Sequence, residues 1–258
     1  MKKETNKIVI SNIDPTNTML INGMADLYAN VFAGPPWNEV TKCVKSNTFY
    51  GPDTQAGNPC PDCQTPLLEA YPKDETTSYI LSELGQTNPI GLLAFVNNEL
   101  AGFSWGYQTN VKGLVESKWK TPKMRQTVQD LLSKYGVKDQ LFYGSETGVD
   151  PQFQGKGIGK QLVRNRLIQV NNSESKYMIV RTNINSSMYG ICQNMGQFTQ
   201  IMGPVAETGW FNKKYKPSYR YINTIDSENT DRVLFLYDKA EYKRRTERRD
   251  YSFGDGMH

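Results

Sequence analysis

The sequence contains few of the residues that usually mark a histidine-based catalytic site, a disulfide framework or a membrane span. It has one histidine, His258, and four cysteines in 258 residues. Because His258 is the last residue, we assign it no catalytic part. No run of about 18 apolar residues is present, so the sequence predicts no transmembrane helix. The start MKKETNKIVIS is basic but lacks the apolar segment of a signal peptide, which favours a cytoplasmic protein.

Charge of one sign is not in large excess either. The formal net charge is +4 and the pI is about 8.7. Basic residues gather in the segment 239–250, but acids are interleaved there, as on a solvated helix end. With 38% hydrophobic and 22% charged residues, the chain is predicted to be globular and not disordered. We therefore expect neither nucleic acid nor a membrane as a partner.

Strand and helix patterns follow one another along the chain. Alternating apolar residues predict strands, and Asn97-Asn98 between two apolar runs predicts a hairpin turn. This order predicts an α/β or α+β fold in which helices flank a mixed sheet, with residues 1–258 forming one domain. Strands are predicted at 7–13, on both sides of the turn in 90–107, and at 140–149, 176–182, 197–202 and 232–238, and helices at 16–33, 77–85, within 117–136, and at 158–170 and 185–195.

A glycine-rich stretch, VDPQFQGKGIGKQLV, joins the strand at 140–149 to the following helix. A Walker P-loop is excluded, because Gly159-Lys160 is followed by Gln161 and the required first glycine falls on Gln154. The dinucleotide fingerprint G-x-G-x-x-G also fails at its third glycine. What remains suits a diphosphate, since glycines let the backbone approach closely and the first amides of a helix point outward unpaired.

This stretch resembles the acetyl-CoA-binding segment of the GNAT N-acetyltransferase superfamily, which reads V-x-P and then Q/R-x-x-G-x-G/A at the start of a helix. Val149, Pro151, Gln154, Gly157 and Gly159 match that pattern. The resemblance covers roughly residues 140 to 200 and extends to a helix that opens at Asn185 and closes near Gly196.

The resemblance implies a mixed sheet splayed between its two central strands, with acetyl-CoA bound in the cleft. The pantetheine arm is then expected near Val149, and the pyrophosphate on the amides from Gly155 to Lys160. The implied cofactor-binding residues are Val149, Gln154, Gly155, Lys156, Gly157, Ile158, Gly159, Lys160 and Asn185.

The implied reaction is direct transfer of the acetyl group to a primary amine of a small molecule, peptide or protein. We predict Glu146 as the general base, because it lies on the strand that leads into the glycine turn. Cys192 occupies the position where the family often has its tyrosine acid, and Tyr189 lies one helical turn earlier. Cys192, Tyr189 and water remain alternatives for the acid. The alternative function is a non-catalytic module with a GNAT-like body that binds CoA or nucleic acid.

Residues 37–71 are predicted to form an insertion, because they are rich in Gly, Pro, Asn, Asp and Cys and carry few apolar side chains. Cys60-Pro-Asp-Cys63 resembles one knuckle of a zinc ribbon, whereas the other knuckle, Cys43 to Ser46, has lost its second cysteine. Three interpretations stay open: a structural zinc on Cys43, Cys60 and Cys63 completed by Asp53 or water, a ribbon without metal, and a disulfide.

Two further segments are expected on the acceptor side. The helix within 117–136 lengthens a connection that is normally short in the family. The aromatic segment 208–222 lies near the last strands. Both are equally compatible with surface cover.

Overall fold

The computed structural model describes residues 7–206, 219–223 and 231–244. For residues 206 and 219–221 it describes the backbone alone. It separates into two compact units, Met1–Tyr107 with Glu146–Leu167 and Gln108–Ser145 with Ile168–His258. No helix in the described ranges is both long and apolar enough to cross a membrane.

The sheet of the first unit is built around a hairpin. Strand β1 (Ile8–Asn12) pairs antiparallel with β5 (Ile90–Val96), which pairs antiparallel with β6 (Glu99–Asn110). Asn97 and Asn98 join β5 to β6 with φ of 50° and 70°, as a two-residue turn of a right-twisted hairpin requires. The last part of β7 (Gln140–Val149) lies beside β6.

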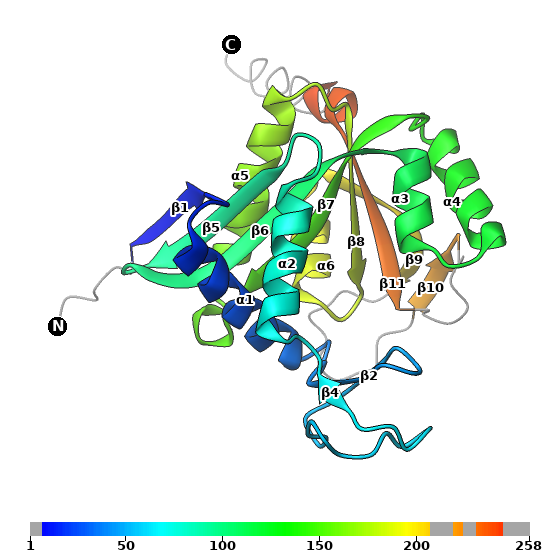
Figure 1. Cartoon of the computed structure of the whole chain (residues 1–258). Coiled ribbons are helices and arrows are strands. Elements are labelled where there is room, and N and C mark those ends of the chain that lie inside the picture. Colours follow the sequence, from blue (N-terminus) through cyan, green and yellow to red (C-terminus); the bar gives the residue numbers. More distant parts are fainter. Residues whose placement is uncertain (1–6, 207–218, 224–230, 245–258) are drawn as a thin grey trace, which may run out of the picture. The chain divides into compact units, whose positions relative to one another are not determined.

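Strand β6 separates two layers of side chains in this unit. Phe103 and Trp105 are fully buried against α1 (Thr18–Ala33) and α2 (Lys73–Leu84), which lie side by side in Figure 1. The alternate position Gly102 faces α5 (Ile158–Asn172), where an added Cβ would lie 3.3 Å from Leu162 Cδ1. Because side chains alternate along a strand, one face of β6 packs against α1 and α2 and the other face packs against α5.

The predicted insertion is a small three-stranded sheet in the order β3-β2-β4, formed by β2 (Thr41–Cys43), β3 (Thr48–Tyr50) and β4 (Leu68–Glu69). Its core consists of Cys43, Cys60 and Leu67, with Tyr50 and Cys63 packed against them. So small an apolar cluster buries little surface, as the composition predicts.

The second unit holds the remaining strands. β7 runs parallel to β8 (Tyr177–Asn183), and their register spans only Phe142–Gly144 and Met178–Val180. β11 (Arg232–Asp238) pairs antiparallel with β8 and with β9 (Phe198–Ala206). β10 (Tyr219–Ile222) pairs antiparallel with the other side of β9. Parallel and antiparallel pairs together make the mixed α/β sheet predicted from the sequence, and this prediction is confirmed.

Of two neighbouring helices in the second unit, the sequence predicts only one. α3 (Val111–Lys118) was not predicted, and the expected helix starts later, as α4 (Pro122–Lys134). Asn110 caps α3, and Thr121 caps α4 with Pro122 in its first turn, so local chemistry explains both starts. α6 (Ser187–Met195) also belongs to this unit.

Candidate active site

The glycine turn of the first unit links β7 to α5 through a short 3₁₀ helix, η1 (Pro151–Phe153). Gly155 and Gly157 have φ of 75° and 79°, a conformation that L-residues rarely adopt. A Cβ atom at either position would have no other atom within 4 Å. The glycines are therefore required by backbone conformation, and the space above them is open.

Among the described residues, the amides of this turn find no backbone acceptor. Within the described part of the chain, no backbone hydrogen bond is donated by the amides of residues 155–160. The first one comes from Gln161 N to Gly157 O at 3.1 Å. Because α5 begins at Ile158, these donors lie at the positive end of its dipole. They form a site with the chemistry to bind a diphosphate.

Polar side chains hold the turn in this shape. The Asp150 amide donates to Ala101 O at 2.9 Å, and the Asp150 carboxylate accepts from the Gln152 amide at 2.9 Å and from Asn30 Nδ2 at 3.1 Å. The Gln154 side chain donates to Val149 O at 3.1 Å. Gln154 thus braces the exit of β7.

Of the two predicted lysines, Lys156 lies against its own turn. Its ammonium lies 4.8 Å from the centre of the Phe153 ring and donates to Gln152 O at 3.3 Å. Lys160 is exposed on the first turn of α5. Both add positive charge at the helix N-terminus.

Glu146 lies on β7, a few residues before the turn. Its Oε1 accepts a hydrogen bond from the Tyr79 hydroxyl at 3.1 Å. Its main-chain carbonyl accepts from Arg166 Nη1, also at 3.1 Å. The predicted base is therefore held at both its backbone and its carboxylate.

Arg166 is a residue of this site that the sequence reasoning missed. It is fully buried, and its Nη1 reaches Ser104 Oγ at 2.9 Å and Trp105 O at 3.0 Å on β6. The same nitrogen lies 3.2 Å from Thr147 Oγ1 on β7. The sequence signal for Arg166 was its place among the apolar residues of a predicted helix, where arginine is rare unless it is paired.

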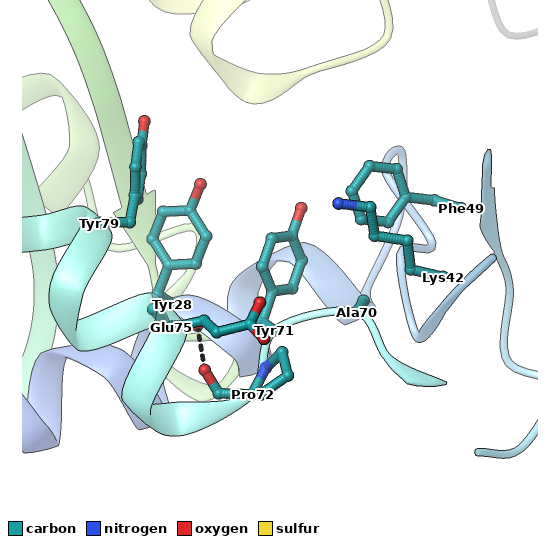
Figure 2. A pocket seen from close by; sticks show the side chains of 9 residues that line it. Tyr28, Lys42, Phe49, Ala70, Tyr71, Pro72, Glu75 and Tyr79 are labelled. Atoms are coloured by element: carbon teal, nitrogen blue, oxygen red, sulfur yellow. Dashed lines mark hydrogen bonds between the residues drawn. The ribbon is translucent and has the colours of Figure 1, made fainter. Parts of the chain in front are cut away.

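A pocket of about 320 Å³ opens in the same unit, beside Glu146's partner Tyr79. Figure 2 shows the hydroxyls of Tyr28, Tyr71 and Tyr79 pointing to the same side, with the Lys42 ammonium turned toward them over Phe49. Sequence reasoning missed this pocket because its rings come from distant segments. The lining residues are Tyr28, Lys42, Phe49, Ala70, Tyr71, Pro72, Glu75, Thr76 and Tyr79.

The hydroxyls of Tyr28 and Tyr107, near Glu146, stay protonated at neutral pH. Burial, with the nearby Glu146 carboxylate next in importance, raises the pKa of Tyr28 well above its usual value. Burial, followed by Glu83, also raises the pKa of Tyr107. A protonated phenol can donate a hydrogen bond, so the surroundings of Glu146 keep their donors at neutral pH.

Three cysteine thiols meet in the insertion. The Sγ atoms of Cys43, Cys60 and Cys63 all lie within 4.8 Å of one another, and Cys43 Sγ is 3.4 Å from Cys63 Sγ. Thiolates on a tetrahedral zinc, at a Zn–S distance of about 2.3 Å, stand about 3.8 Å apart. The thiols are free, so the structure contains no disulfide among them. Their spacing fits three corners of a zinc tetrahedron.

Ser46 and Tyr50 surround these thiols. Hydrogen bonds from the Ser46 hydroxyl and amide lower the pKa of the Cys43 thiol to about 6. The Tyr50 hydroxyl lies 3.2 Å from Cys60 Sγ and donates to Asp62 Oδ2 at 2.7 Å. Ser46 thus occupies the lost fourth position of the knuckle and contacts the thiol of the first ligand.

The remaining predicted residues belong to the second unit. The Asn185 amide donates to Asn183 Oδ1 at 2.8 Å, and α6 is capped by Ser186 instead of opening at Asn185. Cys192 is fully buried, and Tyr189 is nearly so. The Tyr189 hydroxyl accepts from Gln193 Nε2 at 3.3 Å. The acid role of Cys192 or Tyr189 stays a prediction. Residues 208–218 of the predicted acceptor segment lie outside the described part of the chain.

Solved structures share this fold. A polyamine N-acetyltransferase of Drosophila melanogaster aligns over 90% of this chain and 100% of its own, at a TM-score of 0.52 and 12% identity. A mosquito arylalkylamine N-acetyltransferase-like protein, 5b, covers the same shares at a TM-score of 0.51 and 10% identity. An agmatine N-acetyltransferase variant aligns at a TM-score of 0.50 and 13% identity. No protein-family model and no curated protein matches the sequence. The chain has the GNAT fold that its glycine turn predicts.

Proposed function

We propose that this protein is an N-acetyltransferase that moves the acetyl group of acetyl-CoA to a primary amine. The observation that carries the proposal is the glycine turn. Its amides from Gly155 to Lys160 donate no backbone hydrogen bond within the described chain, and the positions above Gly155 and Gly157 are open. These donors, with Lys156 and Lys160, have the charge and geometry that a CoA pyrophosphate needs.

Glu146 is the base of the proposed reaction. It accepts one proton from the ammonium of the acceptor, directly or through water, so that the free amine attacks the thioester carbonyl. A C–N bond forms, the C–S bond breaks, and the attacking nitrogen loses its second proton to water. The leaving thiolate takes a proton from Cys192, Tyr189 or water. The Tyr79 hydroxyl, 3.1 Å from Glu146 Oε1, orients the carboxylate. Arg166 fixes the main chain of the same residue.

A structural zinc on Cys43, Cys60 and Cys63 is the second part of the proposal. Three thiols within 4.8 Å of one another, in a segment with a small apolar core, match a site whose metal supplies folding energy. Among the described residues, the exposed Asp53 is not part of the group of close ligand atoms, so water completes the tetrahedron. The metal has no part in acetyl transfer.

The test combines cofactor capture with turnover. The protein is passed over immobilised CoA, and release of free thiol from acetyl-CoA is then followed with a panel of primary amines. We expect capture and amine-dependent thiol release, and Glu146→Gln should keep capture while losing at least about 100-fold in turnover. Capture without release by any amine identifies the protein as a CoA-binding module. Absence of capture refutes the proposal.

A further inference from the structure

The β2–β3 hairpin presents different chemistry on its two faces. Lys42 pairs with Phe49, and its neighbour Cys43 pairs with Thr48. Successive side chains of a strand point to opposite faces, so Lys42 and Phe49 share one face and Cys43 lies on the other. Lys42 and Phe49 line the aromatic pocket, while Cys43 is buried with Cys60 in the thiol cluster.

A continuous row of rings runs from this hairpin to the proposed base. Phe49 stacks on Tyr71, with ring centres 5.7 Å apart and an angle of 23°. Tyr71 meets Tyr28 edge-on at 5.1 Å, and Tyr28 meets Tyr79 at 5.9 Å. The row, drawn in Figure 2, ends at Tyr79. The Tyr79 hydroxyl donates to Glu146 Oε1. The pocket therefore leads toward the carboxylate that accepts the proton.

The chemistry of the pocket suits a small amine with an apolar body. Its volume of about 320 Å³ lies at the low end of the range for small-molecule sites. Aromatic faces bind hydrocarbon and attract cations, and Glu75 adds a carboxylate to the lining. Such a site binds the hydrocarbon part of an aromatic or aliphatic monoamine. The amine nitrogen is then directed toward Glu146.

Lys42 and Phe49 of the β2–β3 hairpin form one side of the pocket, its outer wall. The folding of this hairpin depends on the thiol cluster. β2 and β3 are three residues each, and the core behind them consists of Cys43, Cys60 and Leu67. Isolated short hairpins are marginal in water, and a metal on the thiols supplies the missing folding energy.

We infer that this row of rings is the acceptor site, and that a metal on Cys43, Cys60 and Cys63 holds its outer wall, so that the metal governs affinity for the amine and not for CoA. The inference rests on the proposed function for the identity of the acceptor. The pocket and the thiol cluster belong to one unit of the structure, and the hairpin is the element that they share.

The experiment measures binding, so that it does not depend on turnover. Full-length protein purified without chelator is assayed for zinc, and part of it is treated with chelator. Dissociation constants are then measured for 2-phenylethylamine, hexylamine and CoA. We expect about one zinc per chain, and a sulfur-to-cobalt charge-transfer band after cobalt exchange. Chelation should weaken both amines at least about fivefold and leave CoA affinity within about twofold.

Two variants keep the inference falsifiable if the chelated protein unfolds. Phe49→Ala removes one ring of the wall without touching a thiol and should weaken 2-phenylethylamine by about 5- to 30-fold at full zinc content. Val44→Ala is the matched control, because Val44 is exposed on the same hairpin. It should change neither the dissociation constant for 2-phenylethylamine nor that for CoA. An unchanged amine affinity in Phe49→Ala, or zinc-free protein that binds amine normally, overturns the inference. CoA capture decides the proposed function separately.

Discussion

Replacement of Gly157 by tryptophan and by alanine separates strain from obstruction at the glycine turn. Its φ of 79° imposes about 1–2 kcal/mol of strain on any L-residue, whatever the side chain. No atom lies within 4 Å of the new Cβ, so the structure predicts no clash at the Cβ in either variant. Both should lose the same stability, about 2–8 °C in Tm for a chain of this size.

Only the tryptophan covers the free amides. Loss of two charge-assisted hydrogen bonds, at about 1.5–3 kcal/mol each, weakens CoA binding about 100-fold or more. Gly157→Ala should lose less than about tenfold. Gly57→Trp is the matched control, because Gly57 has φ of 89° and an equally open Cβ position in the insertion. Calorimetric titration with CoA and thermal unfolding give the two readouts. Unchanged CoA affinity in a folded Gly157→Trp protein refutes the placement of the diphosphate.

Three other substitutions test the neighbouring residues. Arg166→Met removes the donor shared by Trp105 O and Glu146 O and should lower the free energy of unfolding by about 2–4 kcal/mol, measured in urea; a stability equal to wild type contradicts the bracing role. Lys42→Glu reverses a charge at the pocket and should raise the ratio of kcat/KM for 1,6-diaminohexane over 6-aminohexanoate by about tenfold, and an unchanged ratio removes Lys42 from the acceptor site. Gly203→Ala should destabilise the fold by at least about 2 kcal/mol, because its Cβ would collide with Arg232 O at a φ of 97°, and urea unfolding checks this.

Features encoded by neighbouring residues were predictable from the sequence. The glycines of the turn reveal a positive φ, and Asn97-Asn98 reveals a hairpin, because both conformations depend on a few adjacent residues. The three cysteines were predicted to gather because knuckle spacing fixes their geometry. The start of α4 at Pro122 has its signal in Thr121-Pro122, a cap that helical spacing alone does not show.

Features formed by residues that lie far apart in the sequence were not predictable from local patterns. The aromatic pocket joins rings at positions 28, 49, 71 and 79, and no local pattern says that they face one cavity. The Tyr79 hydrogen bond to Glu146 likewise spans two elements far apart in sequence. Helical spacing placed Arg166 in an apolar row, but its acceptors on β6 and β7 appear only when the strands are assembled.

Arg166 donates a hydrogen bond to the main-chain carbonyl at position 146. The backbone there is anchored by a group that does not depend on which side chain the residue carries. Glu146 can therefore be shortened to alanine without displacing β7, which leaves a vacant space beside the Tyr79 hydroxyl. Small carboxylic acids such as formate, added from solution, could enter that space and restore proton transfer, so the position is suited to chemical rescue.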